Sequence, residues 1–405
     1  MKRNFKLYPL LLAVMLLVGC KKDEPTAPMV DPTNITAHFD KKFALLLEKR
    51  GYISDSEKIT QGDVKDVKVL DVSTAYEIGV DTYCCPEGML TSMSGIEYFS
   101  ALTDLKCGYN KLTTLDVSKN IALTTLNCSG NQLTTLNVSN NTVLTILQCM
   151  GNQLTTLDIS NNTALTTLEC GGNLFTALDV SKNTALITLD CNHNQLSTLD
   201  VSNNMALITL LCNNNQLTSL SIGENAVLEC LHCGDYNQLT SLDVGHCKML
   251  NVLECRGNQL TSLDVSNNTR LDRLGCSDNQ LSALDVSKNT ALTSLICVNN
   301  KITILDVSKN TLLATLACKD NQLTILDVSK NTAMIYLFCE SNELTTLDIS
   351  ENRALLRSRC EGNQGNGTIF PVTAWFDNSN VVDFFTIGGW DYNGKTITVD
   401  YKKKS

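Results

Sequence analysis

The sequence predicts a β-rich solenoid: a right-handed coil of about thirteen 21-residue repeats with short parallel strands, a helical N-terminal cap and a β-type C-terminal cap. Two observations predict it. Thirteen cysteines recur every 21 residues, with one step of 22 between Cys233 and Cys255, and an asparagine follows each cysteine after three residues, except that Asn237 is displaced in the longer step. A period this strict indicates units that stack only on their neighbours. The recurring cysteines are Cys107, Cys128, Cys149, Cys170, Cys191, Cys212, Cys233, Cys255, Cys276, Cys297, Cys318, Cys339 and Cys360.

Composition narrows the classes of function. The 405 residues include 42 acidic and 32 Lys or Arg residues, for a net charge of −10. No long basic run is present to neutralise phosphates, so nucleic acid is not expected as a partner. Thirteen of the 18 cysteines belong to one column. Their number therefore reflects repetition and not a disulfide framework.

Residues 1–19 predict a lipoprotein signal peptide. Lys2 and Arg3 precede a short apolar run from Leu10 to Val18, which is too short to span a bilayer as a helix. The following Leu17-Val18-Gly19-Cys20 resembles the bacterial lipobox. The resemblance implies that Cys20 becomes the mature N-terminus and carries acyl chains such as palmitate, which anchor the protein to a membrane. An ordinary signal peptide with a chance cysteine is the alternative.

Residues 20–33 predict a lipidated tether. Lys21-Lys22-Asp23-Glu24 resembles the export signal of surface lipoproteins in the Bacteroidetes, which implies the outer membrane and exposure at the cell surface. A solvated linker with no signal is the alternative. Three prolines in this segment favour an extended chain.

Residues 34–100 predict a helical cap that covers the apolar end of the array. Phe39, Phe43 and Leu46 follow helical spacing, so a helix is expected over residues 36–50, ended by Gly51. Thr60 is expected to cap a second, shorter helix.

Residues 101–364 form the repeat array. From Leu123 a coil follows L-x-x-L-x-C-x-x-N-x-L and then L-x-x-L-x-V-S-x-N. This nested pattern resembles the bacterial leucine-rich repeat class called IRREKO over residues 102–363. Leucines with cysteine or valine should point inward from short strands spaced about 4.8 Å apart. Because the second half carries its own strand-like pattern, short β segments are expected on both faces, rather than outer helices.

Three columns follow from the stacking. The cysteines are expected to be buried thiols, because side chains of parallel strands point the same way and would be strained as disulfides. The asparagines are expected to bond backbone groups coil upon coil. The aspartates of the second half, such as Asp285 and Asp306, are expected to accept local turn N–H bonds beside lysines.

One face carries chemical variety. The residues flanking the fourth leucine differ from coil to coil, whereas the corresponding second-half positions are mostly Thr or Ser. Within the varied face, Ile296, Tyr336 and Phe338 are expected to form an apolar patch bordered by Arg357 and Arg359. Aromatic residues with arginine are typical of binding hot spots. Alternatively, the C-terminal flank covers these residues and they belong to the core.

Residues 365–405 predict the C-terminal β cap. Aromatic residues crowd this segment, and Asn393-Gly394 predicts a hairpin turn before an alternating strand. The alternative function for Trp375 or Trp390 is a platform on which a sugar stacks.

The sequence therefore predicts a binding protein and not an enzyme. No catalytic constellation, metal motif or cofactor-binding loop is apparent. We expect a surface-anchored leucine-rich repeat protein that mediates protein–protein interaction or adhesion through its varied face. Its partner would be an unidentified macromolecule, either a host or bacterial surface protein or a glycan. The alternatives are a glycan-capture lipoprotein and a passive envelope spacer.

Overall fold

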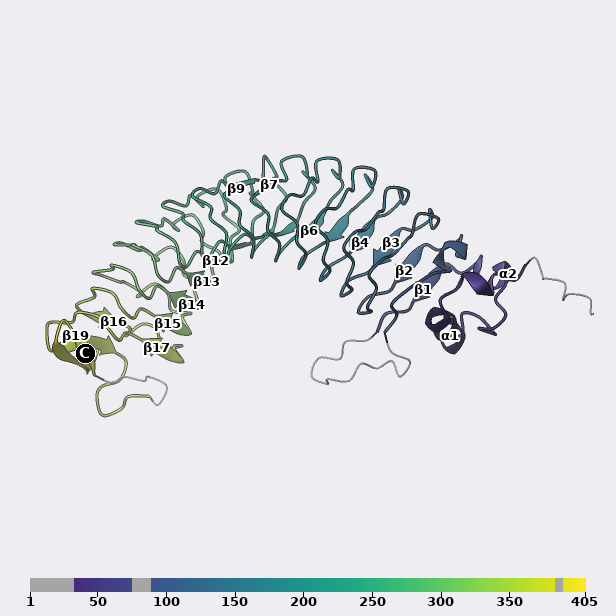
Figure 1. The fold of residues 1–405 in the computed structure, drawn as a ribbon. Coiled ribbons are helices and arrows are strands. Elements are labelled where there is room, and N and C mark those ends of the chain that lie inside the picture. Colours follow the sequence, from purple (N-terminus) through teal and green to yellow (C-terminus); the bar gives the residue numbers. More distant parts are fainter. Residues whose placement is uncertain (1–32, 75–88, 383–388) are drawn as a thin grey trace, which may run out of the picture.

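The computed structural model describes residues 33–74, 89–382 and 389–405, which form an arch of about thirteen stacked coils (Figure 1). The predicted solenoid is thus confirmed. The signal peptide, Cys20, most of the tether and Cys84-Cys85 lie outside the described residues. Within the described part, no helix is both long and apolar enough to cross a membrane.

A parallel sheet of 14 strands lines the inner side of the arch (Figure 1). Its order follows the chain, skipping only strands that belong to the outer side. The strands are β1 (Val69–Asp71), β2 (Asp104–Lys106), β3 (Thr125–Asn127), β4 (Ile146–Gln148), β5 (Thr167–Glu169), β6 (Thr188–Asp190), β8 (Thr209–Leu211), β10 (Cys230–His232), β11 (Val252–Glu254), β12 (Arg273–Gly275), β13 (Ser294–Ile296), β14 (Thr315–Ala317), β15 (Tyr336–Phe338) and β17 (Arg357–Arg359).

Each inner strand buries its middle residue. Leu295, Leu316 and Leu337 pair with one another in register and are inaccessible to solvent. Because side chains alternate along a strand, the first and third residues of each strand point away from this core. The fold therefore presents two parallel rows of variable side chains on the inner face.

The outer side of the coils contains fewer strands than expected. There β7 (Thr198–Asp200) pairs with β9 (Ser219–Ser221), and isolated bridges join Asp116 to Asn137 and Asp327 to Asp348. In an arch the outer arcs lie further apart than the inner ones, so most of them are too far apart to pair. The expected outer β segments thus form in only some of the described coils, and no described coil carries an outer helix.

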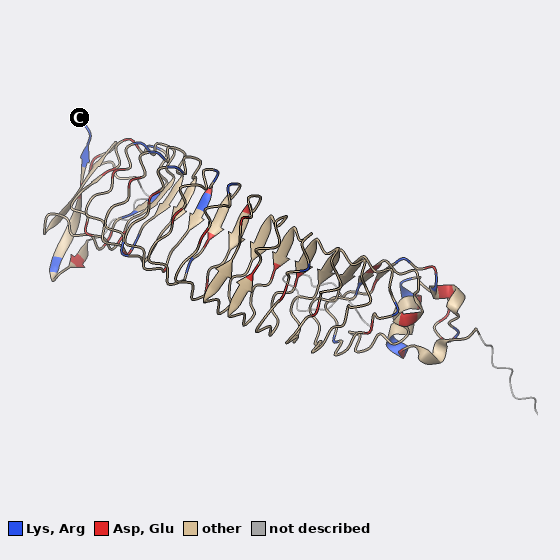
Figure 2. Ribbon diagram, turned by 90° about the horizontal axis from the view of Figure 1, so that it is seen from above, with Lys and Arg blue, Asp and Glu red and all other residues tan. Residues whose placement is uncertain are grey.

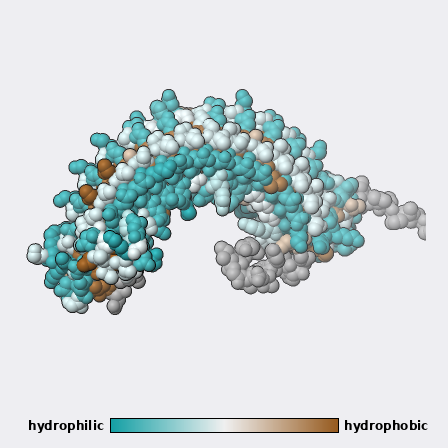
Figure 3. All heavy atoms as spheres, turned by 60° about the vertical axis from the view of Figure 1, so that its left-hand side comes forward, coloured by the Kyte–Doolittle hydropathy of each residue, from teal (hydrophilic) through white to brown (hydrophobic). Residues whose placement is uncertain are grey.

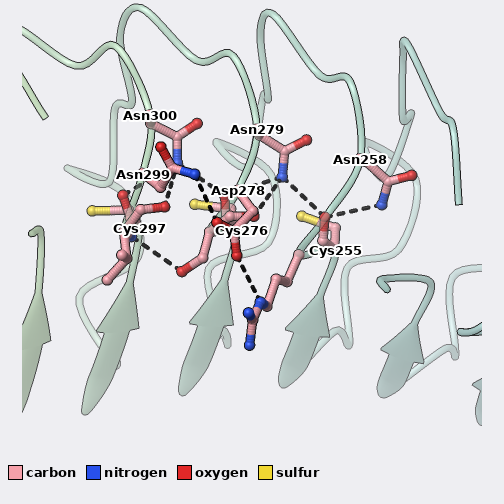
Figure 4. Close-up of polar contacts among 11 residues, drawn as sticks. Cys255, Asn258, Cys276, Asp278, Asn279, Cys297, Asn299 and Asn300 are labelled. Atoms are coloured by element: carbon pink, nitrogen blue, oxygen red, sulfur yellow. Dashed lines mark hydrogen bonds and ion pairs between the residues drawn. The ribbon is translucent and has the colours of Figure 1, made fainter. Parts of the chain in front are cut away.

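Stacked asparagines join the coils behind the inner sheet (Figure 4). The side-chain amide of Asn279 donates to the carbonyl oxygens of Cys255 and Cys276, each at 3.1 Å. Its carbonyl oxygen accepts the backbone N–H of Leu260 at 3.0 Å. The predicted asparagine ladder is thus confirmed. Asn237 keeps the same contacts despite the extra residue in its coil, donating to the carbonyl oxygens of the cysteines before it.

The N-terminal end of the array is covered by short helices. They are η1 (Thr36–His38), α1 (Lys41–Lys49), α2 (Gln61–Val64) and η2 (Ile96–Tyr98). The expected helix over 36–50 begins later, because the Asp40 side chain caps α1 by accepting the N–H of Phe43 at 3.0 Å. As expected, Thr60 caps α2, in a capping box with Asp63.

The C-terminal end is covered by a second sheet. Its order is β16 (Leu347–Asp348), β18 (Ile369–Ala374), β20 (Lys395–Lys403) and β19 (Trp390–Tyr392). The hairpin of β19 and β20 turns at Asn393 and Gly394, both with positive φ (48° and 73°). These angles suit the short turn that the sequence predicts. Phe370 and Tyr401 are buried between this sheet and the last coil.

Candidate functional site

Two aromatic side chains project together from β15 on the inner face. The rings of Tyr336 and Phe338 are stacked, with centroids 6.3 Å apart and planes 8° apart. They lie on the same side of the sheet because they are two residues apart on one strand. Tyr336 is 40% exposed and Phe338 is half-buried.

The two arginines lie on the neighbouring strand. Register places Arg357 opposite Tyr336 and Arg359 opposite Phe338. The Arg357 guanidinium carbon lies 6.0 Å from the centre of the Phe338 ring, within the range of a cation–π contact. Arg359 pairs with Glu340 at 3.8 Å.

Ile296 joins this group less directly. It lies on β13, in the same row as Phe338, with Ala317 of β14 between them. Ile296 is 37% exposed, and the small Ala317 is buried. The structure therefore brings four of the five predicted residues into contact or register on two strands and places the fifth two strands away. We call Ile296, Tyr336, Phe338, Arg357 and Arg359 the inner patch.

The described part of the C-terminal flank does not lie on the inner patch. Its strand β18 joins the sheet at β16 on the outer side, not at β15 or β17. The indole N–H of Trp390 donates to the backbone oxygen of Asn363 at 2.9 Å, and its ring meets Phe370 edge-on at 5.7 Å. Trp375 packs edge-on against Phe376. These contacts are those of a cap.

Acidic groups occupy the same rows toward the middle of the arch. Burial raises the pKa of Asp190, at the end of β6, and of Glu254, at the end of β11. Outside these rows, burial and then the nearby Glu361 raise the pKa of Glu340, which lies near the C-terminal end. Acidic and basic positions recur along the whole ribbon without forming one large block (Figure 2). Charge on the inner face is therefore mixed, with the two arginines of the inner patch at its C-terminal end.

The irregular coil absorbs its extra residue outside the sheet. Leu231 of β10 stays in register with Leu210 and Leu253. The insertion lies in the following turn, where Asp235 and Tyr236 both have positive φ. Tyr236 is consequently 81% exposed.

The cysteine column is buried along the array, and all 15 cysteines of the described residues are free thiols. Burial raises the pKa of Cys128 and of Cys297 to about 12. Such thiols are neutral at physiological pH and act as small apolar core residues.

The aspartate column forms local turns as expected. Asp285 Oδ1 accepts the N–H of Ser287, and Asp306 Oδ1 that of Ser308, each at 2.8 Å. These bonds, with nearby lysines, lower the pKa of both carboxyl groups.

Sequence reasoning missed two exposed apolar features. Ile304 and Ile325 are each 76% exposed on the outer side, where most coils have Thr or Ser, so that side is less uniform than expected. Leu356, which directly precedes β17, is 52% exposed. The two isoleucines can be read directly from the second-half positions of the sequence. Hydrophobic spots remain small and separate on the surface (Figure 3).

The strict period, the inner parallel sheet and the asparagine ladder define a leucine-rich repeat solenoid. Among solved structures, the functional domain of InlJ from Listeria monocytogenes, which includes a cysteine ladder, is 33% identical with a TM-score of 0.70. The match covers 87% of this chain and 83% of that one. The chain belongs to the internalin-type leucine-rich repeat proteins.

Two further structures show the same fold. A leucine-rich repeat protein of Leptospira interrogans is 27% identical, with a TM-score of 0.63 over 69% of this chain and 77% of that one. Internalin InlF of Listeria monocytogenes is 22% identical, with a TM-score of 0.61 over 83% of this chain and 94% of that one. The LVIVD repeat model matches residues 313–339. No curated protein matches the chain.

Proposed function

We propose that this protein is a surface-anchored binding protein that engages a protein partner through the inner patch. The observation that carries the proposal is the stacked pair Tyr336–Phe338, which projects from the inner sheet and is bordered by arginines. Exposed aromatic residues with arginine are typical of the residues that dominate protein interfaces. Solenoids use their extended concave surfaces for binding, and the internalin-type relatives have this fold.

The anchoring and the location rest on the sequence alone. The lipobox at Cys20 and the following Lys21-Lys22-Asp23-Glu24 support attachment by lipid to the outer membrane, facing outward. The nested repeat pattern supports membership of the IRREKO class. A role in adhesion, with a host or bacterial surface protein as partner, is part of the same proposal.

The test uses the full-length protein in a detergent without sugar groups. Binding partners are captured from host extracts and bacterial envelopes, and the affinity of each is then measured. A Tyr336→Ala/Phe338→Ala variant should lose about 2 kcal/mol of binding free energy, roughly a thirtyfold loss of affinity.

The matched control is Ile304→Ala/Ile325→Ala, which removes exposed apolar side chains from the outer side. It should bind as the unmodified protein does. Equal binding by the inner-patch variant, with an unchanged circular dichroism spectrum, would contradict the proposal. Capture of no partner from either source would favour a passive spacer.

A further inference from the structure

A separate groove lies at the N-terminal half of the inner face. It has a volume of about 410 Å³. It is lined by the last residues of β3, β4 and β5 and by the turns that directly follow these strands. Volumes of about 300–1,000 Å³ are typical of small-ligand sites. Strands β6 to β14 separate it from the aromatic pair of the inner patch.

The floor of this groove is a row of polar side chains. Strand register aligns Asn127, Gln148 and Glu169. The Gln148 amide donates to a Glu169 carboxylate oxygen at 2.9 Å, and Asn127 Oδ1 accepts the N–H of Ser129 at 3.0 Å. These bonds fix the orientation of neighbouring amide and carboxylate groups, which together supply hydrogen-bond donors and acceptors.

One wall of the groove is bare backbone. Gly130, Gly151 and Gly172 occupy successive coils at φ of +65°, +61° and +63°. The conformation alone does not demand glycine, because His193 and Asn214 adopt similar positive φ at the same position of later coils. A Cβ at Gly151 or Gly172 would meet only backbone, at 3.4 Å or more. The absence of side chains here is what keeps the groove open.

Tyr109 and His193 place an aromatic ring at each end of the groove, and the groove carries negative charge. Tyr109 lies over Gly130, whose Cβ would fall 2.7 Å from the tyrosine ring, and His193 lines the other end. Among the described residues that line the groove, Glu169 is the carboxylate and none is Lys or Arg. The groove therefore disfavours anionic ligands.

We propose that this groove binds a neutral carbohydrate unit. Sugar hydroxyls both donate and accept hydrogen bonds, as do the oriented side chains of the floor. The apolar face of a sugar ring can rest on bare peptide planes and on the Tyr109 ring. A peptide fits less well, since β3 to β5 are each paired on both sides and leave no edge for an added strand.

The probe is an array of neutral and sialylated oligosaccharides, applied to the full-length protein in a sugar-free detergent. We expect binding to neutral members. A Gly151→Asn variant, which places in the groove a side chain that later coils carry at this position, should lose at least tenfold in affinity. Gly257→Asn is the matched control, since Gly257 has a φ of +70° at the same position of a coil outside the groove. It should leave binding unchanged.

The outcomes separate this proposal from the proposed function. Sugar binding should survive Tyr336→Ala/Phe338→Ala, and protein binding at the inner patch should survive Gly151→Asn. Silence of the whole array, or equal sugar binding by a folded Gly151→Asn protein, would overturn the assignment. So would preferential binding of sialylated members, or of peptides in a parallel peptide array that Gly151→Asn abolishes. Unchanged melting temperatures establish that both glycine variants fold.

Discussion

The side-chain amide of Asn300 donates a hydrogen bond to the carbonyl oxygen of Cys276 in the preceding coil, over 3.1 Å. The same amide donates to Cys297, and its carbonyl oxygen accepts the N–H of Leu281 at 3.0 Å. One buried side chain, whose amide and carbonyl groups both have hydrogen-bond partners, thus joins two coils at several points.

Replacing Asn300 by alanine should destabilise the protein by about 2–3 kcal/mol, because buried backbone groups lose their partners. The control is Asn299→Gly in the same turn, where the exposed side chain is removed and the positive φ is retained. It should change stability by about 0.5 kcal/mol or less. Chemical denaturation measures both, and similar losses would show that the ladder is not what joins the coils.

A second column of buried asparagines, to which Asn310 belongs, should contribute less to stability than the column of Asn300. Asn310 donates to the backbone oxygens of Val286 at 3.0 Å and Asn289 at 2.8 Å. Its own side-chain oxygen has no hydrogen-bond partner among the described residues. Asn310→Ala should therefore cost about 1–2 kcal/mol, less than Asn300→Ala in the same denaturation assay. A larger loss at Asn310 would contradict this order.

Thiol labelling should follow burial. Burial raises the pKa of Cys297 to about 12, so this thiol is neutral at pH 8 and a poor nucleophile. Cys230 is only partly buried and should be the first of the described cysteines to react with iodoacetamide. Mass spectrometry of native and denatured protein identifies the labelled residues. Equal labelling of Cys297 and Cys230 in the native state would contradict the buried column.

Stability should respond to pH through Glu340. Burial, then Glu361, raises the pKa of its carboxyl group, so the folded state binds this proton more tightly than the unfolded chain. The stability it contributes is present below the unfolded pKa of about 4.3 and is lost as pH rises through the folded value. Glu340→Gln should therefore raise the melting temperature relative to the unmodified protein at pH 7 but not at pH 4. Exposed Glu343→Gln is the control, and a pH-independent effect of Glu340→Gln would exclude this mechanism.

The Trp390 ring should stabilise the C-terminal end of the array. Its indole N–H bonds the backbone of Asn363, the last asparagine of the ladder. Trp390→Ala should lower the unfolding free energy by about 2 kcal/mol and increase proteolysis of the tail. Trp390→Phe, which keeps a ring but loses the hydrogen bond, should be intermediate. Normal stability of the alanine variant would mean that this ring serves something other than the cap.

Periodicity was sufficient to predict the array. Residues such as Cys276 and Asn279 recur at one interval, and only stacked coils give every copy the same environment. The hairpin at Asn393-Gly394 was also predictable, because its turn chemistry is local. Where one coil departs from the period, the sheet register holds and the turn accommodates the change, as at Tyr236.

Features that depend on how coils are spaced were harder to predict. The sparse outer strands follow from the curvature of the arch, which no single coil encodes. Register could place Tyr336 beside Arg357, but the parallel stacking of Tyr336 on Phe338 depends on side-chain rotamers. The groove beside Gly151 was not predicted, because a glycine at a turn does not by itself indicate a binding surface. Only the comparison with His193 and Asn214, which adopt a positive φ at the same position of later coils, shows that conformation does not require glycine there.

The unequal bonding of the two sides has a mechanical consequence. Inner strands form one continuous ladder of backbone hydrogen bonds, whereas outer arcs pair as strands at few described places, such as β7 with β9. A change in the spacing of the outer arcs should therefore break few strand pairs. The inner strands should keep their spacing, because each is hydrogen-bonded to its neighbours. We therefore expect the curvature of the arch to change more readily than the spacing of its inner strands, which would let the inner face fit partners of different size.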